Sequence, residues 1–267
     1  MSGMTNEEYD RYYNDVISPY LKRCWDNPLN IDLLAEYQKM STTLKAAAPA
    51  IVSKLSCPFL CLLGPDYKDD YSGTFIIGRE TKKCENAKHN IFSYQDFCDF
   101  APSDNDDCRE KIMMETQAEY VVNNFGGNNR GFFNVAPKIA GCKGIDFLDS
   151  NFVWDELIAV AYKKDTYRKA PSGHSEIISF SKAKLEMELK LAKPKYAIFL
   201  IGDYYEGTTS KHEFTQMFGN VQMKPTVCHD VKTCDLYGTK CFVTIHPCNR
   251  TTTKKDIWKF LAEEIKK

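Results

Sequence analysis

The sequence has 267 residues, a formal net charge of −1 and 43% hydrophobic residues, which fits one large α/β domain with helical additions. The near-neutral charge argues against a protein that coats nucleic acid nonspecifically, because such proteins carry a basic excess that contacts many phosphates. No stretch approaches the roughly 18 apolar residues of a membrane span, and residues 1–15 are acidic and polar, unlike a signal peptide. We therefore expect a cytoplasmic protein without membrane contact.

The N-terminal part of the chain has a helical pattern. Apolar side chains recur every three or four residues in 7–24 and again in 32–55, which predicts two amphipathic helices. We expect residues 1–56 to form a helical extension that packs on an α/β domain of residues 57–267, so that the two form one structural unit.

The α/β domain is predicted from apolar runs that alternate with helical segments. Continuous apolar runs without alternation suit strands that are covered on both faces, as in a parallel sheet. Such runs end at Gly78, Gly202 and His246, and residues 151–162 fit either a strand leading into a helix or a helix. Helices are expected at 108–125, 175–192, 213–219 and 254–267. This order predicts a three-layer α/β/α fold around a mainly parallel, four-stranded sheet.

The eleven cysteines are scattered along the chain, and we interpret them mainly as reduced, buried thiols. Zinc and iron–sulfur sites require tighter groups of ligands. Cys228, His229 and Cys234 come nearest to such a group. We predict that the protein uses neither a metal nor another cofactor.

Polar residues follow three of the predicted strands. Arg79 and Glu80 come after the first strand, Gly202 and Asp203 after a later one, and His246 after the last. In open parallel α/β sheets, ligands bind beyond the carboxyl ends of the strands. We therefore expect these residues to gather at one edge of the sheet, although they are far apart in the sequence.

The strand-end motifs resemble those of the uracil-DNA glycosylase superfamily in kind and order. They are GRET at 78–81, the apolar run ending at Gly202, and HPC at 246–248. In that superfamily the first strand ends at a water-directing residue, a later histidine loop stabilises the transition state and enters the duplex, and an asparagine between them reads the base. The resemblance covers about residues 74–260 and implies these positions for Glu80, His246 and Asp155. Thr81 replaces the usual proline and Cys248 the usual serine.

Glu80 and His246 carry the chemistry that this resemblance implies. Cleavage of an N-glycosidic bond creates a sugar cation, which a carboxylate such as Glu80 can stabilise while it orients water. A histidine such as His246 can donate a hydrogen bond to the departing base. The structural alternatives are a surface ion pair of Glu80 and a His–Pro turn without catalytic function.

Asp155 bears on which base is accepted. A carboxylate accepts hydrogen bonds and therefore pairs with the exocyclic amine of cytosine. Glu156 is an alternative base reader one residue further on, and Asp155 would otherwise be a carboxylate at a helix N-terminus. An enzyme that removed ordinary cytosine would destroy its own genome, so we predict a modified cytosine. The resemblance extends to anti-phage glycosylases that excise glucosylated hydroxymethylcytosine. Two long segments would either form an additional wall of the pocket for this sugar or be solvent-facing loops; they are residues 82–107 and 203–214.

Further residues are predicted to contact DNA. The target nucleotide must leave the duplex for its glycosidic bond to be reached, and Asn249 and Arg250 occupy the position of a wedge. Gly78 and Arg79 are assigned to the base pocket, and Phe92 or Tyr94 would stack on the base. Phosphate contacts are assigned to a basic segment that is otherwise a solvated loop; it contains Lys163, Lys164, Arg168 and Lys169, with Ser172 and His174 nearby.

The sequence thus predicts a monomeric, monofunctional DNA glycosylase that leaves an abasic site after removing a modified cytosine. The alternatives are a uracil-DNA glycosylase, a catalytically inactive DNA-binding protein of the same fold, and an α/β enzyme that processes nucleosides.

Overall fold

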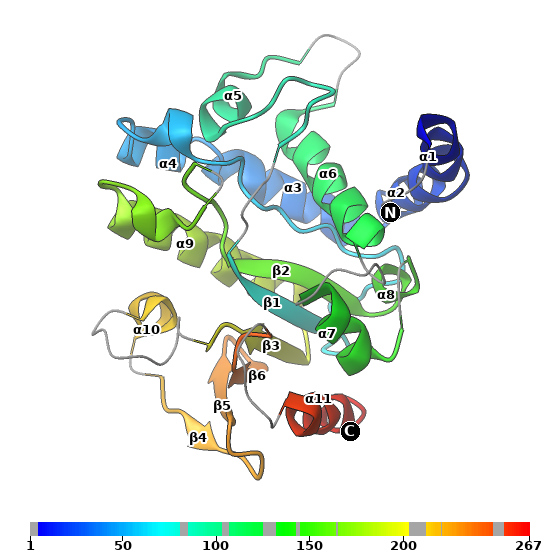
Figure 1. Ribbon diagram of the computed structural model, residues 1–267, viewed down its shortest axis with the longest axis vertical. Coiled ribbons are helices and arrows are strands. Elements are labelled where there is room, and N and C mark those ends of the chain that lie inside the picture. The colour runs from blue at the N-terminus through cyan, green and yellow to red at the C-terminus, as the bar shows by residue number, and fades with distance from the viewer. Residues whose placement is uncertain are drawn as a thin grey trace.

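The computed structural model describes residues 5–80, 85–102, 107–124, 132–142, 145–163, 165–202, 212–219, 221–247 and 254–267. Within these ranges the chain forms a six-stranded sheet with helices on both sides (Figure 1). The α/β class predicted from the sequence is confirmed, but the predicted number of four strands is wrong.

The sheet has the strand order β2-β1-β3-β6-β5-β4. The first four strands in this order are mutually parallel, and β5 and β4 continue the sheet antiparallel. Their bounds in chain order are β1 (Thr74–Glu80), β2 (Phe152–Ile158), β3 (Tyr196–Leu200), β4 (Lys224–Pro225), β5 (Val231–Leu236) and β6 (Thr239–Thr244). Three parallel strands correspond to the predicted runs that end at Gly78, Gly202 and His246. The fourth, β2, shows that residues 151–162, which fitted either a strand leading into a helix or a helix, begin with a strand. The two additional strands form the antiparallel edge.

The β5–β6 hairpin accounts for most of the difference from the predicted sheet. Tyr237 and Gly238 form its two-residue loop, and both have positive φ angles, 53° and 85°. Two-residue hairpin loops with this geometry match the twist of the adjoining strands, and a glycine adopts it without steric cost. The glycine was therefore a usable signal for a hairpin.

In the described residues before β1, the helices are α1 (Asn6–Tyr12), η1 (Tyr13–Ile17), α2 (Ser18–Cys24), α3 (Pro28–Met40), α4 (Thr43–Ala47) and η2 (Val52–Lys54). Those that follow β1 are α5 (Tyr94–Asp99), α6 (Arg109–Asn124), α7 (Phe132–Ala140) and α8 (Ile145–Asp149). The remainder are η3 (Tyr167–Lys169), α9 (His174–Ala192), α10 (Glu213–Phe218) and α11 (Lys254–Glu264). The helices predicted at 108–125, 175–192, 213–219 and 254–267 are confirmed, whereas the one predicted at 32–55 is divided among α3, α4 and η2.

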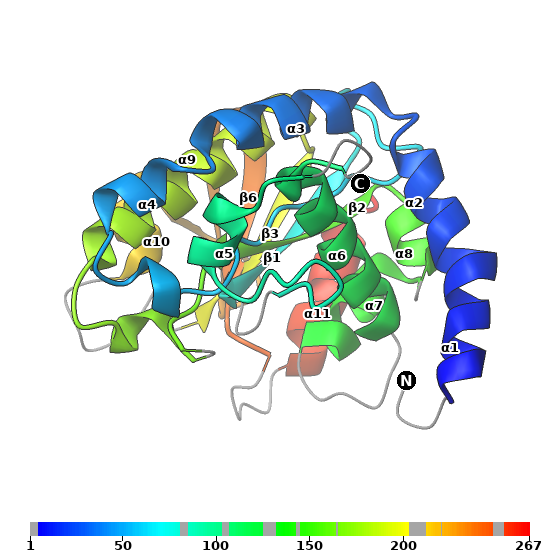
Figure 2. The same ribbon diagram turned by 90° about the horizontal axis from the view of Figure 1, so that it is seen from above.

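The helices form a layer on each side of the sheet. On one side α9 packs against α3 and α4, and on the other α7 packs against α11 (Figure 2). The parallel strands are consequently covered on both faces, which explains why β3 is buried along its whole length. This arrangement agrees with the predicted three layers.

The N-terminal helices belong to the same hydrophobic cluster as the sheet. Asn30 of α3 shows how the connection is made, because its side chain accepts a hydrogen bond from the Leu63 N–H and donates one to the Leu63 carbonyl, both 2.9 Å long. Residues 57–63 run buried beside the chain that follows β2, where the Phe59 N–H donates to the Ala159 carbonyl at 2.7 Å. None of the helices in the described ranges combines the length and apolar composition that crossing a membrane requires.

Candidate functional site

The strand register brings the predicted catalytic positions to one level of the sheet. Ile77 on β1 pairs with Phe199 on β3, and Phe199 pairs with Val243 on β6. Glu80, Gly202 and His246 each lie three residues further along the chain than these partners. Because neighbouring strands are about 4.8 Å apart, the paired residues Ile77 and Val243 are separated by roughly 10 Å across the sheet. Glu80 and His246 follow them beyond the last β1–β3 pair. We call the carboxyl ends of β1, β3 and β6 at this level the rim.

The strand order makes the rim a favourable place for a ligand. From β1 the chain crosses to β2 on one side, whereas from β3 it continues to β6 on the other side. The strand order therefore reverses between β1 and β3, and the crevice outside such a reversal is where open α/β sheets bind ligands. At Gly202 the chain leaves β3 with a φ angle of 55°, so the backbone turns at this point.

Glu80 and His246 are held at the rim in different ways. Glu80 is the last residue of β1 and pairs with Ile158 of β2 through its backbone, while its side chain lies outside the part that the structure describes. His246 follows β6 by two residues and is 8% exposed. The next residue, Pro247, accepts a 2.8 Å hydrogen bond from Lys254 at the start of α11. Arg79 of β1 is partly exposed.

Gly78 lies inside β1, where it makes room for Glu156. Its register partner on β2 is Glu156, which is 9% exposed. A Cβ atom at Gly78 would lie 2.3 Å from the Glu156 Oε2 atom, so only glycine allows this close approach of the carboxyl group. The carboxyl group of Glu156 therefore lies beside Gly78, two residues before Glu80. The sequence alone did not indicate that the glycine makes room for this second acidic residue.

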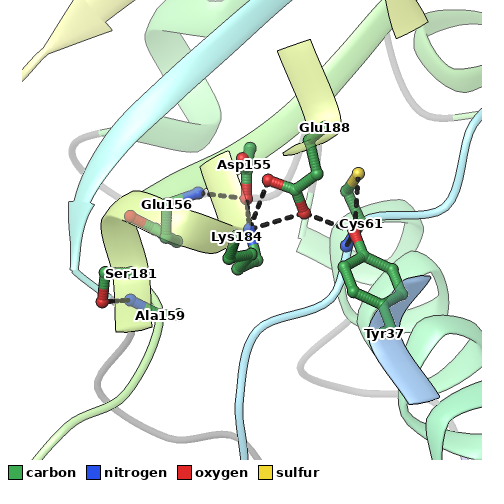
Figure 3. A network of polar contacts seen from close by, with 8 residues as sticks. All are labelled: Tyr37, Cys61, Asp155, Glu156, Ala159, Ser181, Lys184 and Glu188. Atoms are coloured by element: carbon green, nitrogen blue, oxygen red, sulfur yellow. Dashed lines mark hydrogen bonds and ion pairs between the residues drawn. The ribbon is translucent and has the colours of Figure 1, made fainter. Parts of the chain in front are cut away.

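Asp155 is in the interior and not at the rim. Lys184 of α9 donates to its Oδ1 atom at 2.6 Å and contacts the two oxygens of Glu188 at 2.7 and 2.8 Å (Figure 3). All three side chains are 0% exposed. Consecutive residues of a strand point to opposite faces, so Asp155 faces α9 while Glu156 lies over Gly78. The prediction that Asp155 reads a base is wrong in this structure, because its carboxylate is enclosed in an ion-pair cluster, and it is not at a helix N-terminus either.

Charge and burial set the protonation of this cluster. Burial would lower the pKa of Lys184, but the charges of Asp155 and Glu188 keep it above its ordinary value. Burial, followed by the charge of Asp155, raises the pKa of Glu188 to about 8. One ammonium group then balances one carboxylate, and the second carboxyl group keeps its proton at neutral pH.

Neighbouring groups complete the cluster. Tyr37 of α3 donates its hydroxyl hydrogen to Glu188 and accepts a 3.2 Å hydrogen bond from the Cys61 N–H. The Oδ2 atom of Asp155 is buried and receives no hydrogen bond from the N–H or O–H groups that the structure describes. A proton carried by Glu188 is the hydrogen that Asp155 can accept, and this bond contributes to the raised pKa of Glu188. The cluster therefore joins β2, α9 and α3 through the interior.

Arg168, one of the predicted phosphate contacts, is committed to a carboxylate of the protein. Its Nε and Nη2 atoms donate to the two oxygens of Glu213 at 2.5 and 2.6 Å, and Tyr167 donates to the same carboxylate at 2.5 Å. Glu213 is the first residue of α10 and is buried. A two-pronged Arg–carboxylate pair of this kind is strong and directional. We therefore correct the assignment of Arg168, which fixes α10 against η3.

The other basic residues of this segment remain compatible with a phosphate contact. Lys163 is exposed, and its ammonium group lies 5.5 Å from the centre of the Tyr162 ring. Lys169 forms an exposed 2.5 Å ion pair with Asp165, which contributes little and breaks readily. Phosphate binding by these two lysines stays a prediction. Lys164, Asn249 and Arg250 lie outside the described residues.

The two candidate stacking residues differ in accessibility. Phe92 is 48% exposed, so its ring is accessible. Tyr94 is buried in the core, where its hydroxyl group donates to the Ser41 carbonyl at 2.7 Å. The structure thus excludes Tyr94 as a stacking residue and leaves Phe92 as a prediction.

The residues considered for a metal do not form a site. His229 has a fully exposed side chain that contacts Asp230 at 3.2 Å, and Cys234 pairs across the hairpin with Cys241. Among the residues that the structure describes, no three His, Cys, Asp or Glu side chains are grouped in a way that could hold a metal ion.

The partner residues of the interior cluster were missed in the sequence. Lys184 and Glu188 are four residues apart on α9 and occupy its buried stripe, together with Ile177, Ser181 and Leu185. Opposite charges at apolar positions of a helix are rarely buried unless they are paired. That combination was the signal that a third charged residue, here Asp155, would be found in the interior.

Comparison with known proteins gives no family to which this site can be assigned. No model of a known protein family matches the chain, and no curated protein is similar to it.

Proposed function

We propose that the protein is a DNA glycosylase that cleaves an N-glycosidic bond with Glu80 and His246. The observation that carries this proposal is the strand register, in which Glu80, Gly202 and His246 each follow mutually paired residues of the parallel strands by three positions. An acidic residue and a histidine are two groups that can promote N-glycoside hydrolysis. The strands that carry them are roughly 10 Å apart, which is compatible with a flipped nucleotide between the two residues.

Each residue has a separate role in the proposed reaction. The Glu80 carboxylate stabilises the positive charge that develops on the sugar and orients the attacking water molecule. The imidazole of His246 donates a hydrogen bond to the departing base, whose charge increases as the bond breaks. His246 suits this role because its near-complete burial strengthens such a hydrogen bond. No proton or electron beyond those of water and the base is needed.

For the substrate we propose a modified cytosine in foreign DNA, such as glucosylated hydroxymethylcytosine. With Asp155 in the interior, Glu156 is the acidic residue next to the rim that can accept a hydrogen bond from the exocyclic amine. In this proposal the protein acts as a cytoplasmic monomer, Lys163 and Lys169 bind phosphates, and Phe92 stacks on the base. Asn249 and Arg250 enter the duplex.

A single-turnover assay tests the reaction. Matched duplexes that contain cytosine, hydroxymethylcytosine, its glucosylated form or uracil are incubated with excess protein, cleaved with alkali at abasic sites, and the released bases are identified by mass spectrometry. We expect release of the glucosylated base, with Glu80→Gln and His246→Ala each slowing it by about 100-fold or more while DNA affinity changes little. Glu263→Gln, at an exposed position of α11, serves as the control and should retain the wild-type rate.

The outcomes distinguish the alternatives. Wild-type rates for Glu80→Gln would contradict the mechanism, and a gel shift without base release would indicate an inactive DNA-binding protein. Release of uracil alone would leave the glycosylase proposal standing and overturn the role of Glu156. Hydrolysis of free nucleosides but not of DNA would favour a nucleoside-processing enzyme.

A further inference from the structure

A separate cavity of about 730 Å³ opens between the N-terminal helices and α6. Its volume is within the usual range for small-molecule sites. Tyr9 and Tyr13 on one side and Glu115, Glu119 and Asn123 on the other contribute to its wall. In both views α1 lies at the opposite end of the molecule from α10, the helix that follows β3 (Figures 1 and 2). This cavity is therefore distinct from the rim.

Among the described residues, the hydrogen-bond donors to two carboxylates of the wall are neutral groups. The Trp25 Nε1 atom donates to Glu115 at 2.6 Å, and the Tyr9 hydroxyl group donates to Glu119. Within the described part of the chain, neither carboxylate has a Lys, Arg or His at ion-pair distance, and Lys111 of the same helix pairs with Asp107 at 2.7 Å. Burial raises the pKa of Glu115, although the Trp25 hydrogen bond and the charges of Lys111 and Lys88 lower it. A positively charged ligand would stabilise this largely buried carboxylate further.

Aromatic rings face the same space. The ring centres of Tyr9 and Tyr13 are 6.5 Å apart, and burial, followed by Glu119, raises the pKa of both hydroxyl groups, that of Tyr9 to about 12. Both side chains consequently remain neutral phenols. The face of such a ring attracts an ammonium group. Tyr13 is also the first residue of the π-helix η1, which interrupts the helical N-terminus at the cavity wall, and such interruptions are frequent at binding sites.

The side-chain oxygen of Asn123 is a further hydrogen-bond acceptor in the wall of the cavity. Its Oδ1 atom is buried and has no hydrogen-bond partner among the residues that the structure describes. A buried acceptor of this kind is costly unless a ligand or water donates to it. A ligand that combines a positive charge with several N–H groups satisfies carboxylate and amide oxygens together, whereas phosphates and fully alkylated ammonium ions do not.

The spacing of the two glutamates indicates more than one ammonium group. Glu115 and Glu119 are four residues apart on α6, and both line the cavity together with Asp10. Two carboxylates at this spacing match two positive charges that are separated by an aliphatic chain. We propose that this cavity binds a linear aliphatic diamine or polyamine, with its ammonium groups on Glu115 and Glu119 and its chain against the tyrosine rings.

Isothermal titration calorimetry with putrescine and spermidine at constant ionic strength tests the proposal on the full chain. We expect one saturable site that Glu115→Gln and Glu119→Gln each weaken by about tenfold, since a charge-assisted hydrogen bond is lost. Tyr13→Phe should bind like the wild type because the aromatic face remains, whereas Tyr13→Leu should bind several-fold more weakly. Glu263→Gln on α11 is the control for a loss of surface charge.

Three results would overturn the proposal. One is wild-type affinity in the Glu119→Gln variant. Another, which needs no variant, is a wild-type titration in which tetramethylammonium or Mg²⁺ binds as well as spermidine, because binding would then follow charge alone and not N–H donation. An absence of saturable binding by either amine would have the same meaning. These outcomes do not depend on whether the rim cleaves DNA.

Discussion

Replacing Glu188 by glutamine is expected to remove a pH dependence of folding stability. Lys184 lies between Asp155 and Glu188 in the interior, and all three side chains are fully enclosed. One ammonium group can balance only one of the two carboxylates, and a second uncompensated charge in the interior would be costly. The structure meets this constraint by raising the pKa of Glu188 to about 8 through burial and the charge of Asp155.

The direction of the effect follows from proton linkage. In the unfolded chain Glu188 has its ordinary pKa of about 4.3, so between that value and about 8 the folded protein holds one proton more than the unfolded one. The stabilising contribution is complete below the ordinary pKa and is lost as the pH rises through the folded pKa. One proton corresponds to about 1.4 kcal/mol per pH unit, which gives a loss of about 2–3 kcal/mol between about pH 5 and about pH 7.

Urea unfolding at several pH values measures this loss. The free energy of unfolding of the wild type should fall relative to Glu188→Gln by that amount, because the glutamine cannot titrate. Glu186→Gln is the matched control on the same helix: the pKa of Glu186 is lowered, chiefly by its hydrogen bond with Lys190, so its contribution is constant over this interval. Parallel curves for the wild type and Glu188→Gln would refute the conclusion that Glu188 is protonated at neutral pH.

Three further predictions concern stability, measured by denaturant or thermal unfolding. Gly78→Ala should cost about 1–2 kcal/mol because its Cβ atom would displace the Glu156 carboxyl group, and Glu156→Ala in the same chain should recover most of the loss; no loss in the single variant would contradict the close approach. Gly238→Ala should cost about 1 kcal/mol through its φ angle of 85° alone, since the added atom meets nothing closer than 3.7 Å. Arg168→Lys should lose about 1–2 kcal/mol because lysine cannot reproduce the two-pronged contact with Glu213, and an unchanged melting temperature would refute that role.

The elements that could be predicted from sequence are those with an unambiguous apolar pattern. β1 and β3 are continuous apolar runs, and α9 has a long three- and four-residue repeat, so burial alone specifies them. β5 was missed because its sequence VKTCDL mixes polar and apolar residues, as suits a strand nearer the edge of the sheet. Its pairing with β6 depends on the hairpin loop at 237–238 and not on an apolar run of its own.

Some positions of the candidate site could likewise be predicted from the sequence, and others could not. That Glu80 lies at the end of one strand and His246 follows another strand of the same parallel sheet could be predicted, because both come after continuous apolar runs. The position of Asp155 could not be predicted from its own surroundings, since its environment is set by Lys184, which is 29 residues further along the chain. Arg168 was misassigned for the same reason, because its partner Glu213 belongs to another helix. The local sequence pattern therefore does not predict ion pairs between residues that are far apart in the chain.

Asp155 and Glu156 show how much a single residue of register decides. Both are carboxylates in an otherwise apolar strand, and the two-residue period of the strand sends one to each face. On one face Lys184 compensates the charge, and the residue stabilises the packing of α9 on the sheet. On the other face Gly78 leaves space for the carboxyl group of Glu156, two residues before the end of β1. In the proposed function Glu156, and not the enclosed Asp155, is the acidic residue that reads the base, so Glu156→Gln, and not Asp155→Asn, is the substitution that should alter which base is released.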